Sequence, residues 1–101
     1  MVKEIDFGGQ KRPVKFGWNA LATFGDLTGT GLNDLIKFSN EMTFSEVLVL
    51  IYAGLKEGAR ASGVTFDIIQ EQIGDWLDED TGKVQEFIEI FQDQMPKAKK
   101  E

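Results

Sequence analysis

Alternating apolar and polar residues near the start of the chain predict a β-hairpin. The apolar positions are Ile5 and Phe7 before a Gly8-Gly9 pair, and Val14 and Phe16 after it. Such runs around two glycines are typical of a hairpin with a primed turn. Pro13 has no N–H to donate, so the second strand is short or lies at an edge. Because an isolated hairpin is marginal in water, we expect residues 1–17 to lie on helices or to pair with another chain.

The strongest helical pattern covers residues 43–62. Thr43 and Glu46 have the spacing of a capping box, and Gly63 is a suitable residue to follow the helix. Apolar residues occupy nearly every side of this segment. A helix of this kind is typical of the middle of a bundle, so we predict that the other elements surround it.

Weaker helical patterns lie on both sides of this segment. Apolar residues recur every third position over 18–27, and a short apolar run covers 32–38. Thr65 is predicted to cap a helix whose buried side carries Phe66, Ile69, Ile73, Trp76 and Leu77. Gly74 within it costs about 1 kcal/mol relative to Ala, which indicates close packing or a short helix. The last helix has apolar residues at i, i+3, i+4, i+7 and i+11, namely Val84, Phe87, Ile88, Phe91 and Met95, and Pro96 ends it.

These patterns predict a mainly α fold, a small bundle of four to five helices around a central apolar helix with a short N-terminal β-hairpin. A length of 101 residues fits one domain. We divide it into a hairpin at 1–17, a helical bundle at 18–96 and a basic tail at 97–101.

Composition excludes several classes of function. The chain has 11 basic and 17 acidic residues, a net charge of −6, and so lacks the positive surface that nucleic-acid binding needs. It has no cysteine and no histidine, which removes thiolate chemistry and the commonest general base and metal ligand. No stretch reaches the roughly 18 apolar residues of a membrane span. We therefore expect an intracellular protein without nucleic-acid or membrane partners.

Candidate ligand motifs do not meet their chemical requirements. A calcium loop beginning at Asp78 would place Lys83 at the glycine position, and one aligned on Gly82 would begin at Leu77 instead of a carboxylate. The glycines of residues 25–31 lack the Lys-Ser/Thr pair of a phosphate loop. The carboxylates fall on polar helix faces or in a turn. We expect no catalytic, metal or cofactor site, and no enzyme activity.

Three segments resemble a known family over nearly the whole chain. They are F-G-W-N-A-L-A-T-F-G from Phe16, T-F-S-E-V-L-V-L-I-Y-A-G-L from Thr43, and T-F-D-I-I-Q-E-Q-I-G-D-W-L from Thr65, followed by an amphipathic helix. This order resembles the tail assembly chaperones of long-tailed, siphovirus-type bacteriophages. The resemblance implies a non-enzymatic helical protein that acts in the host bacterial cytoplasm and is absent from the finished virion. Its implied partner is the tape measure protein, with the tail tube protein as a second candidate.

A chaperone of this kind needs exposed apolar surface. We expect the hairpin and the last helix to supply it, together with two isoleucines outside the apolar stripes. Ile68 and Ile90 either widen this partner-binding surface or are ordinary isolated exposed residues. The full predicted set is Ile5, Phe7, Ile68, Phe87, Ile90, Phe91 and Met95. We also expect homo-oligomers, with an open hairpin edge as one means of joining subunits. The alternative function is a small acidic dimeric adaptor, unrelated to phage, that pairs through its last helix.

Overall fold

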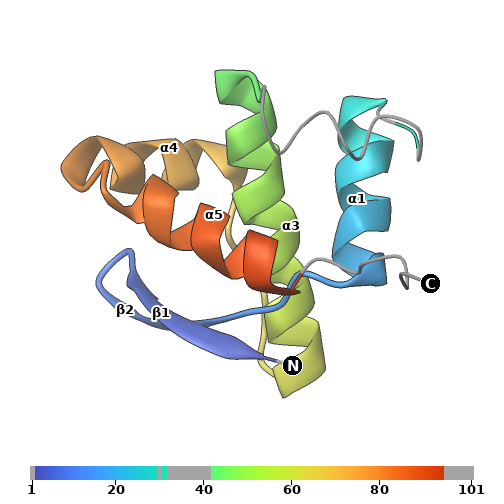
Figure 1. Ribbon diagram of the computed structural model, residues 1–101. Coiled ribbons are helices and arrows are strands. Elements are labelled where there is room, and N and C mark those ends of the chain that lie inside the picture. Colours follow the sequence, from blue (N-terminus) through green and yellow to red (C-terminus); the bar gives the residue numbers. More distant parts are fainter. Residues whose placement is uncertain (1, 30, 32–41, 95–101) are drawn as a thin grey trace.

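The computed structural model describes residues 2–29, 31 and 42–94 of the chain. Along these residues the elements follow in chain order: β1 (Lys3–Phe7), β2 (Gln10–Val14), α1 (Trp18–Thr28), α3 (Phe44–Ser62), α4 (Gln70–Glu79) and α5 (Lys83–Gln94) (Figure 1). The fold is mainly helical with an N-terminal antiparallel hairpin, as predicted. The helix expected at 32–38, Met95 and the tail at 97–101 lie outside the described residues.

The hairpin forms as the sequence predicts. Gly8 and Gly9 adopt φ values of 64° and 85°, the left-handed conformations that a primed two-residue turn requires. The strands pair in a register that sets Phe7 opposite Gln10 and Glu4 opposite Pro13. Hydrogen-bonded and non-hydrogen-bonded pairs alternate away from the turn, so Glu4 and Pro13 form a non-hydrogen-bonded pair. Pro13 therefore costs the ladder no hydrogen bond.

The outer edge of β2 packs directly on α3. A methyl group built on Gly58 would collide with the backbone of Pro13 and Val14, so strand and helix meet backbone to backbone. The amide of Lys15 donates to the carbonyl of Gly54 at 3.0 Å. The hairpin thus lies on the helices, one of the two arrangements expected. Pro13 has no N–H, so its nitrogen needs no hydrogen-bond acceptor where this edge meets the helix.

Both predicted end signals of α3 are present. The Glu46 amide donates to Thr43 Oγ1 at 3.1 Å, and the Thr43 amide donates to Glu46 Oε1 at 2.8 Å. Gly63 follows the helix with φ 72°. α3 contacts α1, β2 and α4, and α1 runs antiparallel beside it (Figure 1). Its first residue, Phe44, is 93% exposed, so the apolar character of this helix does not mean burial along its whole length.

The helix predicted to follow a cap at Thr65 begins four residues later than expected, with Ile69 in the cap position. Residues 64–69 are not helical, and Ile69, the residue before α4, is extended with φ −109° and ψ 162°. Successive side chains of an extended chain point to opposite sides. Ile68 is therefore buried and Ile69 is 56% exposed, the reverse of the predicted pattern. A methyl group built on Gly74 would meet no atom within 4 Å, so close packing does not explain this glycine. The other expected explanation, a short helix, agrees with the 10 residues of α4.

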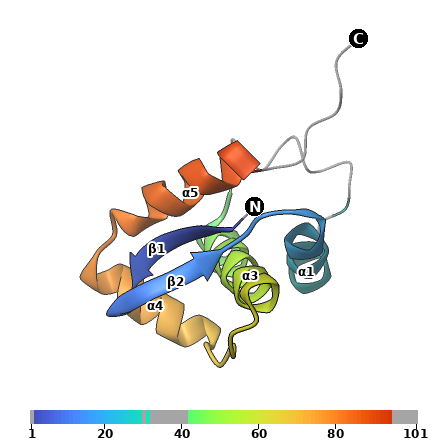
Figure 2. The same cartoon turned by 90° about the horizontal axis from the view of Figure 1, so that it is seen from below.

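Aromatic side chains join the hairpin to the last two helices. The Phe7 ring meets the rings of Trp76 and Phe87 edge-on, with centroids 5.2 Å and 4.9 Å away. Phe16 and Phe91 meet in the same manner at 5.4 Å. Figure 2 shows the hairpin crossing the molecule beside α4 and α5. Within the described residues, none of the helices combines the length and apolar character needed to cross a bilayer.

Candidate interaction surface

The structure places most of the predicted partner-binding residues in the core. The buried members, each at most 8% exposed, are Ile5, Phe7, Ile68, Phe87 and Phe91. The expectation that these five form an exposed surface is corrected. Phe7 of the hairpin packs on Phe87 of α5, so these two apolar faces cover one another, and Ile68 is buried in the extended segment before α4. Ile90 is half-buried against the core. Met95 lies outside the described residues.

A different set of large apolar side chains is exposed on the described part of the chain. Its members are Val2, Trp18, Leu27, Phe44, Val64 and Ile69. Helical periodicity assigns Trp18, Leu27 and Phe44 to the apolar stripes of their helices, and so it misses them as surface residues. One signal could have identified Phe44, since it directly follows the capping residue Thr43 and so lies at the very end of its helix.

Leu27 and Phe44 lie at the same end of the α1–α3 pair. Leu27 is the penultimate residue of α1 and Phe44 is the first residue of α3. Because the two helices are antiparallel, the end of one lies beside the start of the other (Figure 1). We refer to Leu27 and Phe44 as the distal apolar end. Both side chains are more than half exposed.

A groove runs between α1 and the C-terminal half of α3. Its volume is about 680 Å³. It is lined by residues of α1, of α3 and of the connection to α4, namely Asn19, Ala22, Thr23, Asp26, Lys56, Glu57, Arg60, Val64 and Phe66. We refer to this surface as the α1–α3 groove. The Phe66 ring is held edge-on against Tyr52 of α3, with centroids 5.4 Å apart.

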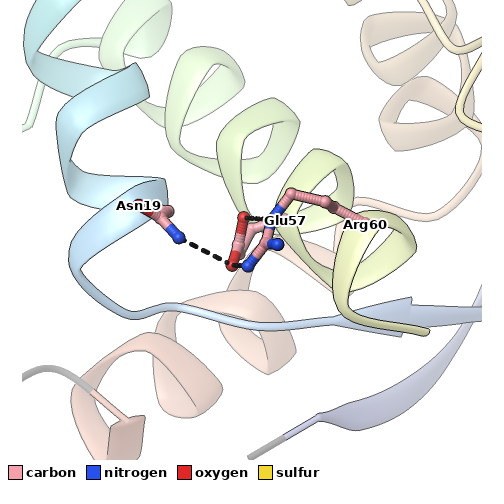
Figure 3. A network of polar contacts seen from close by, with 3 residues as sticks. All are labelled: Asn19, Glu57 and Arg60. Atoms are coloured by element: carbon pink, nitrogen blue, oxygen red, sulfur yellow. Dashed lines mark hydrogen bonds and ion pairs between the residues drawn. The ribbon is translucent and has the colours of Figure 1, made fainter. Parts of the chain in front are cut away.

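A buried carboxylate links the two walls of the groove. Glu57 is 5% exposed and accepts hydrogen bonds from Asn19 Nδ2 at 3.3 Å and from Arg60 Nε at 2.8 Å. Arg60 Nη2 donates to the same carboxylate, so the guanidinium binds in a bidentate manner. Figure 3 shows Asn19 reaching from α1 toward Glu57 and Arg60 on α3. The network ties α1 to α3 across the groove.

This network lowers the pKa of Glu57. The hydrogen bonds from Arg60 are the largest cause, and they act against burial, which raises the pKa. The bond from Asn19 and the charges of Arg60 and Lys15 lower it further. The same carboxylate raises the pKa of Arg60. A carboxylate held ionised and fully engaged suits a structural role, since it is poorly placed to accept a proton.

A second polar cluster anchors the tip of the hairpin. The Arg12 guanidinium lies 4.6 Å from the centre of the Trp76 ring and donates to the Phe7 carbonyl through Nε at 2.7 Å. Gly8 packs so closely on Trp76 that a methyl group would overlap the ring. Burial lowers the pKa of Arg12, and the charge of Asp67 acts in the opposite direction. These contacts hold β1 and β2 on α4.

Neither polar cluster forms a metal site. Among the described residues, no group of three or more acidic side chains is arranged to hold a metal ion. Comparison of the chain with protein-family models, with curated proteins and with solved structures finds no match in any of the three.

Proposed function

We propose that this protein is a non-enzymatic tail assembly chaperone that binds the tape measure protein through its distal apolar end. The observation that carries the proposal is the 93% exposure of Phe44, the highest among the exposed large apolar side chains of the described residues. The resemblance of the Phe16–Gly25 and Thr43–Leu55 segments to the phage family supports the choice of partner. In this proposal α3 is the central scaffold that presents Phe44.

The distal apolar end has the chemistry that a holding chaperone needs. Leu27 and Phe44 offer apolar contact without a fixed hydrogen-bonding pattern, which suits a long helical client with many similar segments. Binding would cover apolar residues of the tape measure protein that otherwise drive its aggregation. The protein then acts in the host cytoplasm during assembly, with the tail tube protein as a second partner, and leaves before the virion is complete.

The decisive experiment is co-expression with a tape measure fragment. We expect the wild-type chain to keep the fragment in the soluble fraction. Phe44→Asp and Leu27→Asp should each reduce the soluble fragment several-fold, because a charge at an apolar contact must be desolvated. Ile69→Asp is the matched control, since it introduces the same charge at an exposed apolar residue that lies at the start of α4.

Two results would count against the proposal in different ways. If the wild-type chain fails to solubilise the fragment, the chaperone function is wrong. If Phe44→Asp folds and works as well as the wild type, the function stands but the distal apolar end is not the binding surface. In the adaptor alternative, pairing through the last helix would have to use residues other than Phe87 and Phe91, because these two are buried.

A further inference from the structure

We propose that the α1–α3 groove is a two-fold interface with a second copy of this chain, in which Trp18 of each copy enters the groove of the other. The proposal does not rest on the chaperone function, since it uses a different surface from the distal apolar end. Three features carry it: the exposed side chain of Trp18 next to the groove residue Asn19, a hollow with some apolar surface on each side, and walls of opposite charge.

Trp18 is the projecting side chain. It is the first residue of α1 and is 65% exposed. Its neighbour Asn19 lines the groove, but Trp18 does not line the groove of its own chain. An indole at this position has little to pack on within the monomer. Tryptophan is among the residues that contribute most to binding when a partner covers them.

The groove can receive such a side chain. Its volume of about 680 Å³ lies in the range of pockets that hold groups larger than an indole. Ala22 and Thr23 form a low wall on the α1 side, and Val64 and Phe66 supply apolar surface on the other. Val64 is itself half exposed, so an inserted ring would cover it.

The charges of the groove favour a second copy over other occupants. Asp26 lies on the α1 wall and Lys56 on the α3 wall, and the ion pairs of the described residues involve neither of them. In a two-fold interface each contact occurs twice with the roles exchanged. Asp26 of each copy can then face Lys56 of the other. A peptide of one charge sign would match one wall and be repelled by the opposite wall.

The first test measures self-association by sedimentation equilibrium. We expect the wild-type chain to form a dimer and Trp18→Ala to raise its dissociation constant on the order of 30-fold, the effect of losing a central aromatic anchor. Ile69→Ser, which removes an apolar side chain of similar exposure elsewhere, should leave the constant unchanged. A wild-type chain that is monomeric at about 1 mM, or a Trp18→Ala chain that dimerises as tightly as the wild type, overturns the proposal.

The second test uses the paired charges and does not depend on Trp18. Asp26→Lys and Lys56→Asp should each weaken self-association, because like charges then face one another. An equimolar mixture of the two variants should form a heterodimer, since both opposite-charge contacts are restored across the interface. Both positions are exposed, so circular dichroism of each variant should match the wild type. If the mixture remains monomeric, the paired arrangement is wrong and the proposal fails with it.

Discussion

At the scale of single residues, Glu57 shows how this domain tolerates a buried charge. A carboxylate that leaves water pays a large desolvation cost unless strong partners replace the solvent. Glu57 has two such partners, Asn19 on α1 and Arg60 one turn along α3. No buried side-chain nitrogen or oxygen atom of the described residues lacks a hydrogen bond. The negative charge is therefore held without leaving an unsatisfied group at the α1–α3 contact.

Replacing Glu57 by Gln should destabilise the protein in a pH-dependent way. At pH 7 we expect the free energy of unfolding to fall by about 1 kcal/mol. This is less than for a wholly buried ion pair, because the exposed Arg60 side chain can bind water once the carboxylate is gone. The folded-state pKa of Glu57 is below its ordinary value of 4.5. Between these two values the unfolded chain binds more protons than the folded one, so the free energy of unfolding falls as the pH falls.

The measurement is urea unfolding at several pH values. The difference between wild type and Glu57→Gln should be full above pH 4.5 and should shrink as the pH falls through the lowered pKa. Glu86→Gln is the control, because the Glu86 side chain is 52% exposed and its pair with Lys83 at 3.2 Å should contribute little to stability. A difference for Glu57→Gln that is constant down to acid pH would contradict the assigned network.

At the scale of helices and strands, elements with local end signals were predictable. The Gly8-Gly9 turn, the Thr43–Glu46 capping box and Gly63 each act within a few residues, and each is found as predicted. The start of α4 was not, although Thr65 has the chemistry of a cap. There the burial of Ile68 favours an extended chain, and the side chain of Gln72 accepts the Ile69 amide at 2.9 Å instead. Tertiary contact outweighed the local signal.

Replacing Gly58 of α3 and Gly74 of α4 by alanine should change the stability of the protein in opposite directions. Gly58→Ala should destabilise the protein by about 1–3 kcal/mol, because the added methyl meets the backbone of Pro13 and Val14, which cannot rotate away. Gly74→Ala should stabilise it by up to about 1 kcal/mol, since no atom is near and alanine favours a helix.

Thermal unfolding of the two glycine variants checks this difference. Equal shifts in melting temperature for both would show that helix propensity alone decides. Opposite shifts would show that α3 needs Gly58 in order to approach β2. The sequence did not reveal this need, because the strand that presses on Gly58 lies more than forty residues earlier in the chain.

At the scale of the whole molecule, the two ends of the described chain depend on one another. The Phe16 amide donates to Gln94 Oε1 at 2.8 Å, and the Phe16 ring packs on Phe91. Phe7 similarly fills the space between α4 and α5. Periodicity identifies these aromatic faces but not which element covers which, since that depends on long-range packing. For this reason the sequence alone suggests a binding surface where the fold has buried aromatics.

Phe7→Ala should therefore unfold much of the protein and not merely release the hairpin. Truncating a buried phenylalanine typically costs about 3–5 kcal/mol, a large share of the roughly 5–15 kcal/mol that stabilises a small domain. Phe44→Ala removes the same atoms from an exposed site and should change stability by less than about 0.5 kcal/mol. Urea unfolding followed by far-ultraviolet circular dichroism compares the two. A Phe7→Ala chain as stable as the wild type would show that the hairpin is dispensable.

The two tryptophans occupy unlike surroundings, and this gives the molecule its own optical reporters. Trp76 lies under Gly8, with the Arg12 cation over its ring, whereas Trp18 is largely in water. The fluorescence of Trp76 therefore reports whether the hairpin remains packed on α4. The fluorescence of Trp18 reports whether α1 contacts a second chain. A variant that keeps only one of the two tryptophans can therefore follow one event on its own, without any attached dye.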